Sequence, residues 1–344
     1  MSAESTITAT VLAGGIGGAR FIRGLTQSDS VKEFLAHNFD GAQLDVTVIG
    51  NTGDDIWVHG LRVCPDLDTI MYTLGGGISA ERGWGRENET FTAKEELAAY
   101  GVEPTWFGLG DRDIATHLVR TTSLQSGYTL SEVTQALCTR WKPGVNLIPM
   151  SDERCETHVV VEHPDTGSRV AIHFQEWWIK YRASLPALDF VYVGLDQAKP
   201  APGVIDAIAS ADVVILPPSN PVVSIGTILN IAGIREALLN TNAPVVGLSP
   251  IIGGAPVRGM ADACLSAIGV ETSAAGVALH YGARTEGGVL DSWLVDTVDS
   301  DSVKNISAAG INTRAVPLLM SDIEATGEMA CEALALAFNS TLNA

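Results

Sequence analysis

The stretch VLAGGIGGARFIRGL, residues 11–25, constrains the fold of this chain more than any other feature. An apolar run leads into four glycines within five residues, and a helical pattern follows. A strand, a glycine turn and a helix in this order typify α/β proteins whose backbone N–H groups receive an anion. A tight structural turn is the alternative, but two Gly-Gly pairs exceed what a turn needs. We therefore expect a nucleotide-type ligand at Gly14, Gly15, Gly17 and Gly18.

The same stretch departs from the dinucleotide fingerprint. Arg20 stands where the third glycine of G-x-G-x-x-G belongs, and Asn51-Thr52 follow the second strand where a ribose-binding acid is expected. No Gly-Lys-Ser/Thr follows either, which excludes a P-loop. An NAD-dependent oxidoreductase is therefore the weaker interpretation.

Short β-branched runs alternate with helical patterns along the rest of the chain, which predicts a mostly parallel sheet with helices on both faces. The predicted strands are Thr6–Leu12, Asp45–Gly50, Phe190–Gly194, Val213–Leu216 and Val245–Leu248. We predict one domain over residues 1–344, with a core at about 5–75 and 185–344. The insert, at about 76–184, holds a helical layer (93–141) and a β-hairpin that turns at PDTG.

The composition excludes several classes of partner. The 344 residues carry a net charge of −19, which argues against a nucleic-acid partner. No apolar run is long enough for a membrane span, and the start MSAESTITAT does not resemble a signal peptide. The five cysteines are scattered, as expected of reduced thiols. We expect a cytoplasmic protein with no membrane partner.

Four aspartates gather after the second predicted strand. Asp54 and Asp55 follow it directly, and Asp66 and Asp68 lie in a PDLDT turn about a dozen residues on. Ligands of open α/β sheets lie beyond the carboxyl ends of the strands, and carboxylates suit Mg²⁺. A turn residue at Asp54 and a helix cap at Asp68 are the alternative, but four acids around one crevice favour a metal site.

Many separate motifs carry a family resemblance. They are, in chain order, AGGIGGAR, GNTGDD, CPDLDTIMYTLGGG, RGWGRENETF, WFGLGDRDIATHLVRT, HFQEWW, PPSNPVVSIG and SPIIGG. Together they resemble the 2-phospho-L-lactate transferase family of coenzyme F420 biosynthesis, and its actinobacterial members in particular. The resemblance implies a Rossmann-like three-layer core and a homodimer. It also implies transfer of a phosphoenolpyruvyl or 2-phospho-L-lactyl group from a guanosine diphosphate-linked donor to 7,8-didemethyl-8-hydroxy-5-deazariboflavin (Fo), which releases GMP with the help of Mg²⁺.

The resemblance also implies roles for individual residues. The four glycines, with Asn51 and Thr52, would bind the donor nucleotide. Asp54, Asp55, Asp66 and Asp68 would hold Mg²⁺, and Asp54, Asp55 and Asp68 would carry the catalysis.

Further candidates follow from this chemistry. Ser219 and Asn220 stand between a predicted strand and a helix, a second anion-ready turn. Trp177 and Trp178 are stacking candidates for Fo, and strand alternation would point their rings to opposite faces, while Arg112 is a possible charge partner. A non-catalytic nucleotide-binding regulatory protein on the same scaffold is the alternative, and the group on the donor (enolpyruvyl, lactyl or glyceryl) stays open.

Overall fold

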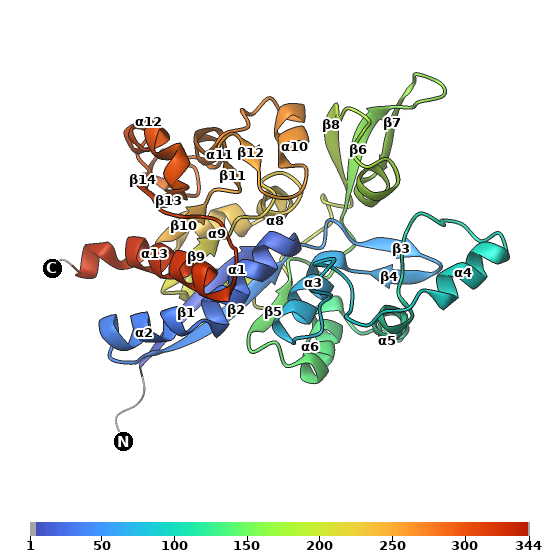
Figure 1. Ribbon diagram of the computed structural model, residues 1–344, viewed down its shortest axis with the longest axis horizontal. Helices are drawn as coiled ribbons and strands as arrows, with labels where there is room; N and C mark the ends of the chain where they lie inside the picture. The colour runs from blue at the N-terminus through green and yellow to red at the C-terminus, as the bar shows by residue number, and fades with distance from the viewer. Residues whose placement is uncertain (1–4, 343–344) are drawn as a thin grey trace.

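A seven-stranded sheet forms the centre of the protein (Figure 1). The structure is a computed structural model that describes residues 5–342, with side chains described to 338. The strand order is β14-β13-β10-β9-β1-β2-β5, and each neighbouring pair is parallel. The strands are β1 (Thr6–Ala13), β2 (Gln43–Gly50), β5 (Asn146–Pro149), β9 (Val213–Leu216), β10 (Val245–Leu248), β13 (Ser292–Val295) and β14 (Asn312–Ala315). The predicted mostly parallel sheet is confirmed.

The strand order reverses between β1 and β9. The chain builds outward from β1 through β2 to β5 on one side, and from β9 through β10 and β13 to β14 on the other. Val11 of β1 therefore lies between Val48 of β2 and Ile215 of β9. Such a reversal is the switch point at which doubly wound sheets bind their ligands.

Helices cover both faces of the sheet and make three layers. One face carries α1 (Gly15–Gln27), α2 (Asp29–Asn38), α3 (Pro65–Leu74), α6 (Leu130–Trp141) and α13 (Ile323–Leu342). The other face carries α7 (Val204–Ser210), α8 (Ile225–Asn230), α9 (Ile234–Asn240), α10 (Ala261–Ala267), α11 (Ala274–Tyr281) and α12 (Val303–Ala308). Val11 packs in the first core and Leu12 in the second, both fully buried. Burial on both sides explains why the strand ends in the apolar run Val11–Ala13.

The remaining elements extend from one end of the sheet, where Figure 1 shows the antiparallel strands β6–β8 and the pair β3–β4 with α4. They are β3 (Ile56–Val58), β4 (Leu61–Val63), α4 (Thr92–Ala99), α5 (Asp111–Gln125), β6 (Glu156–Glu162), β7 (Arg169–His173) and β8 (Asp189–Val193). A short hairpin, β11 (Ile251–Ile252) with β12 (Ala255–Pro256), and the helical turns η1 (Glu176–Lys180), η2 (Arg284–Glu286) and η3 (Thr297–Ser302) complete the chain. The predicted helical layer and hairpin are present.

Two strands differ from the predicted division into core and insert. β5 falls in the predicted insert but pairs with β2 in the central sheet. The run predicted as Phe190–Gly194 is β8, which pairs antiparallel with β6 outside the parallel sheet. In β8 only Phe190 is buried, because one face of this small sheet meets solvent. None of the helices in residues 5–342 is long and apolar enough to cross a membrane.

Candidate active site

A cavity of about 1030 Å³ opens at the carboxyl ends of β1 and β9, the switch point of the sheet. The glycine turn after β1, the turn after β9 and the start of α3 form its polar end. Aromatic side chains from the 84–107 segment and from the region after β7 form its other end. One hollow therefore joins an anion-ready end to an aromatic end.

The glycine turn contributes three of its four predicted glycines to the cavity. Gly14, Gly15 and Gly17 line it, and Gly15 begins α1 with a φ of +65°, which a side chain would strain. The first N–H groups of a helix have no partner within the helix, so the start of α1 can receive an anion.

Close packing explains why side chains are missing from this turn. A Cβ on Gly17 would lie 2.2 Å from the carbonyl oxygen of Pro218, and one on Gly18 would lie 2.8 Å from Ser219 Oγ. A Cβ on Gly14 would lie 2.5 Å from Asp66 Oδ2. The glycines thus let the turns after β1 and β9 and the start of α3 meet at one point.

Ser219 and Asn220, both predicted, line the cavity from the turn after β9. Ser219 Oγ donates to the carbonyl of Gly14 (3.0 Å), which ties this turn to the glycine turn. Asn220 Oδ1 accepts from the N–H groups of Val222 (2.9 Å) and Val223 (3.2 Å). These bonds fix the shape of the turn before α8.

The four aspartates do not form one cluster. Within residues 5–342, no three His, Cys, Asp or Glu side chains are placed to hold a metal ion together. Asp54, Asp66 and Asp68 line the cavity, whereas Asp55 does not.

Asp54 and Asp66 form a carboxylate pair at the polar end. Burial and the charge of Asp66 raise the pKa of Asp54 well above its ordinary value. Burial raises the pKa of Asp66 to about 6, although Asn51 Nδ2 donates to its Oδ2 (2.9 Å). Asp54 Oδ1 is buried and has no hydrogen-bond partner among the described residues. An unsatisfied oxygen beside a second carboxylate fits a hard divalent cation, and Mg²⁺ commonly uses one or two carboxylates plus phosphate oxygens of the substrate.

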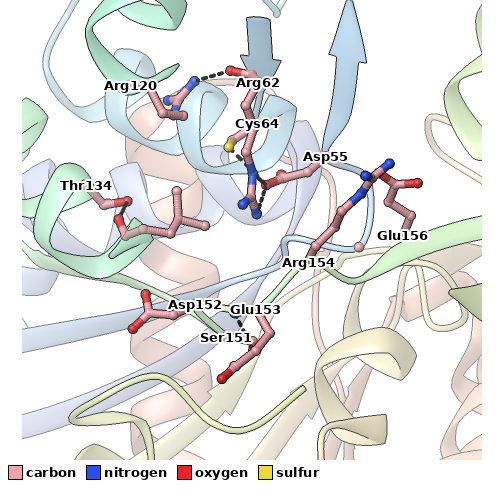
Figure 2. Close-up of polar contacts among 12 residues, drawn as sticks. Asp55, Arg62, Cys64, Arg120, Thr134, Ser151, Asp152, Glu153, Arg154 and Glu156 are labelled. Atoms are coloured by element: carbon pink, nitrogen blue, oxygen red, sulfur yellow. Dashed lines mark hydrogen bonds and ion pairs between the residues drawn. The ribbon is translucent and has the colours of Figure 1, made fainter. Parts of the chain in front are cut away.

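Asp55 is absent from the cavity lining, and its carboxylate forms a buried ion pair with Arg62 (Figure 2). It accepts from Nη2 of Arg62 (3.0 Å), and the thiol of Cys64 donates to the same carboxylate oxygen (2.9 Å). The side chains of Arg62 and Asp55 are 7% and 6% exposed. This environment ties Asp55 to β4, while its other oxygen, Oδ1, is buried without a hydrogen-bond partner among the described residues, and its predicted roles in metal binding and catalysis stay predictions.

Asp68 is neutralised by Arg120, a fully buried residue of α5 that pairs with both of its carboxylate oxygens. His117 lies behind the pair, with Nδ1 3.1 Å from Arg120 Nη1 and Nε2 3.4 Å from Asp113. The hydroxyl of Tyr72 donates to Asp113 (2.6 Å). Although burial acts to raise it, the nearby imidazole of His117 and the hydrogen bond from Tyr72 hold the pKa of Asp113 below its usual value. These side chains make a rigid polar wall along the cavity.

Trp177 and Trp178 do not lie on a strand, since β7 ends at His173 and both residues belong to the π-helical turn η1. Trp177 is fully buried, and its Nε1 donates to the carbonyl of Leu185 (2.7 Å). Trp178 lines the cavity and stacks on Phe174, with ring centroids 6.3 Å apart. Only Trp178 lines the cavity, and both indole rings contact Phe174 from a helical turn, so the strand alternation on which the prediction rested does not apply.

Several cavity residues were not predicted as site residues. They are Tyr72, Trp84, Phe91, Lys94, Trp106, Phe107 and His117. The motifs RGWGRENETF and WFGLGDRD contained most of the aromatic rings, but their spacing did not show that they converge. Of the other predicted residues, Asn51 and Thr52 are fully buried and lie outside the cavity lining, and Arg112 is exposed and lines a different hollow.

These features define a doubly wound, Rossmann-like α/β protein with a ligand cavity at its switch point. The model of the 2-phospho-L-lactate transferase CofD family matches residues 9–336, and the chain belongs to this family. The resemblance in the sequence motifs is thereby confirmed.

Relatives with high identity bear a common name, phosphoenolpyruvate transferase. The protein from Streptomyces coelicolor is 64% identical over 327 residues, which cover 95% of this chain and 97% of the relative. Those from Thermobifida fusca and Mycobacterium avium are 63% and 57% identical, over 95% of this chain and 97% and 98% of theirs. Family and relatives support a transferase with a role in coenzyme F420 biosynthesis.

Solved structures share the fold. Protein BH3568 from Bacillus halodurans matches with a TM-score of 0.58 and 18% identity, over 96% of this chain and 99% of that one. A second crystal structure of that protein, described as a member of the upf0052 family, gives a TM-score of 0.57. At this identity the likeness shows the α/β architecture alone.

Proposed function

We propose that the protein transfers a phosphoenolpyruvyl or 2-phospho-L-lactyl group from a guanosine diphosphate-linked donor to Fo, which yields dehydro-F420-0 or F420-0 and GMP. The observation that carries the proposal is the single cavity, with a glycine turn and carboxylate pair at one end and aromatic rings at the other. Family membership and the names of the relatives support it.

The polar end suits the donor diphosphate. The start of α1 offers backbone N–H groups, and the Ser219 bond to Gly14 keeps the two turns in register. Arg20 and Arg258 also line the cavity and supply positive charge in a strongly acidic chain. Phosphoryl transfer depends mainly on such positioning and charge neutralisation.

The Asp54–Asp66 pair would hold the Mg²⁺ ion. When bound, that ion would neutralise charge on the donor phosphates. Asn51 orients Asp66 through its side-chain amide, whereas Asp55 and Asp68 form ion pairs with Arg62 and Arg120. Asp54 and Asp66 thus line the cavity without an arginine partner, and phosphate and water would fill the remaining ligand positions of a bound cation.

The aromatic end suits the flat tricyclic ring of Fo. Trp84, Trp106 and Trp178 all line this end, and aromatic pairs are worth about 0.5–1.5 kcal/mol beyond the area that they bury. Between the two ends, the acceptor hydroxyl would attack the phosphorus that carries the enolpyruvyl or lactyl group. A new P–O bond forms and the bond to the GMP phosphate oxygen breaks, so that GMP leaves with the electron pair, while the acceptor O–H bond breaks and its proton passes to water.

The test is a reaction of the purified protein with the guanosine diphosphate-linked donor, Fo and Mg²⁺, followed by chromatography of GMP and the deazaflavin product. Equal amounts of GMP and product are expected, and the enolpyruvyl, lactyl and glyceryl donors compared in parallel identify the natural one. GDP binding without turnover would favour the regulatory alternative, and saturable micromolar NAD binding would favour the oxidoreductase.

We further infer a cytoplasmic homodimer, which the family resemblance and the scattered cysteines support. Light scattering of the purified protein tests the dimer, since a mass near 36.2 kDa would indicate a monomer.

A further inference from the structure

A second hollow, of about 330 Å³, lies where α3 ends. Its lining includes the 75–77 glycine turn after α3, Arg86, Arg112, Arg140 and Trp141, and we call it the arginine hollow. The Trp141 ring packs on Tyr72, which lines the main cavity, with centroids 4.7 Å apart. The two rings therefore stand between the arginine hollow and the main cavity.

The arginine hollow concentrates positive charge in an acidic chain. The sequence has 40 Asp and Glu residues against 21 Lys and Arg residues. Five other arginines pair with a carboxylate, but Arg86, Arg112 and Arg140 form no ion pair with any described residue. One carboxylate, Glu87, also lines the hollow, so its charged lining is three arginines against one glutamate, and like charges at close range favour a bound anion.

The donors of the arginine hollow are held in place and unsatisfied. The guanidinium groups of Arg86 and Arg140 lie over the Trp141 ring, 5.0 and 4.8 Å from its centroid. Arg86 Nη1 donates to the carbonyl of Arg112 (3.1 Å), but Arg86 Nε and Trp141 Nε1 are buried with no hydrogen-bond partner among the residues that the structure describes. Buried N–H groups without partners are uncommon in proteins, and two of them stand here beside three arginines.

The glycine turn leaves room for such a ligand. A Cβ on Gly77 would lie 2.2 Å from the Trp141 ring, so the missing side chain lets the ring fold over the turn. A Cβ on Gly76 would meet nothing within 4 Å, so the floor beside it is open. The N–H groups of Gly75 and Gly77 are already bonded to α3 carbonyls, which leaves the side-chain donors to hold an anion.

We propose that the arginine hollow is a second binding site, for a small polyanion that carries phosphate or carboxylate groups. Planar guanidinium groups bind both kinds of group in bidentate fashion. An occupied hollow would fix Trp141 against Tyr72, whose hydroxyl bonds to Asp113 in the main cavity. An anion in the hollow could thus alter ligand binding in the main cavity through Trp141 and Tyr72. This effect does not depend on which substrate the main cavity binds.

Titration calorimetry at fixed ionic strength tests this site, with pyrophosphate and citrate as probes. The proteins are the wild type, Arg112→Gln, Arg140→Gln and the control Arg169→Gln, which removes the same charge from the exposed hairpin. The Arg112 side chain forms no hydrogen bond or ion pair with any residue that the structure describes, so its substitution should leave the packing intact. In each hollow variant, the dissociation constant of the probe at one site should rise about tenfold, which is the loss expected for a charge-assisted hydrogen bond. Arg169→Gln should bind the probe as tightly as the wild type does.

The two probes separate the sources of the anion. Tighter binding of pyrophosphate identifies a phosphate ligand, and tighter binding of citrate a carboxylate ligand. Mutual displacement that is weakened in Arg112→Gln shows that both probes use the hollow and not the polar end of the main cavity. Failure of both probes to saturate the wild type in the millimolar range would overturn the proposal. So would equal weakening in Arg169→Gln, because net charge alone would then explain the effect.

Discussion

Trp178→Ala should weaken Fo binding without unfolding the protein. Trp178 is partly exposed, lines the aromatic end of the cavity and stacks on Phe174. Loss of one stacking face removes about 0.5–1.5 kcal/mol, and the lost burial of apolar area adds about 1.5 kcal/mol. The sum, about 2–3 kcal/mol, corresponds to a rise in the Fo dissociation constant of about 30- to 140-fold.

Trp177→Ala is the matched control, because the neighbouring indole is fully buried and bonded to the carbonyl of Leu185. Removal of a buried tryptophan should lower the free energy of unfolding by about 3–5 kcal/mol. Fo binding is measured by fluorescence titration, and stability by urea unfolding, for both variants. Donor affinity, measured with GDP, should stay unchanged in Trp178→Ala.

The reasoning fails if Trp178→Ala binds Fo as tightly as the wild type. The acceptor would then lie against the other aromatic residues of the cavity, Trp84 and Trp106. If Trp177→Ala is stable but binds Fo weakly, Trp177 and not Trp178 contacts the acceptor. That result would refute the assignment of Trp177 to the core.

Three further predictions concern the supports of the site. Asp55→Asn should lower the free energy of unfolding by about 3–5 kcal/mol, because it leaves the buried Arg62 without its carboxylate; unchanged urea unfolding would refute this. Gly17→Ala should lower the free energy of unfolding by about 1–3 kcal/mol and weaken GDP binding, because its Cβ would overlap the Pro218 carbonyl oxygen. A GDP affinity equal to that of the wild type, measured by calorimetry, would contradict this prediction. Burial acts to raise the pKa of Glu156, but hydrogen bonds from His158 and Arg154 hold it at about 2, so this carboxylate stabilises the fold above pH 4.5. Glu156→Gln should therefore lose on the order of 2 kcal/mol at neutral pH, and the difference should narrow as pH falls from about 5 towards 3; a pH-independent difference in urea unfolding would show that the charge plays no part.

Features that depend on neighbouring residues could be predicted from the sequence. The glycine turn, the position of Asp54 after β2 and the turn after β9 each follow from one strand and the residues that come next. The carboxyl ends of parallel strands meet at one edge, so these separate predictions combined into a single site.

Features that depend on distant partners could not be predicted. The four residues of β5 and the five of β8 carry no local signal of which sheet they join. The pairing of Asp55 with Arg62 and of Asp68 with Arg120 depends on how β4 and α5 pack, so the sequence showed four equivalent aspartates. No residue after His173 signals the end of the strand, so the sequence predicts strand alternation for Trp177 and Trp178, which the structure places in a helical turn.

The Asp54–Asp66 pair is tested most directly by the rate of GMP release, measured against Mg²⁺ concentration with donor and Fo in excess. The proteins are the wild type, Asp54→Asn and, as a control, Asp165→Asn in the exposed hairpin turn. An amide is a poor ligand for a hard cation, so Asp54→Asn should slow turnover at limiting Mg²⁺ by about a hundredfold, while Asp165→Asn follows the wild type. An Asp54→Asn protein that releases GMP at the wild-type rate at limiting Mg²⁺ would contradict a metal site on this pair.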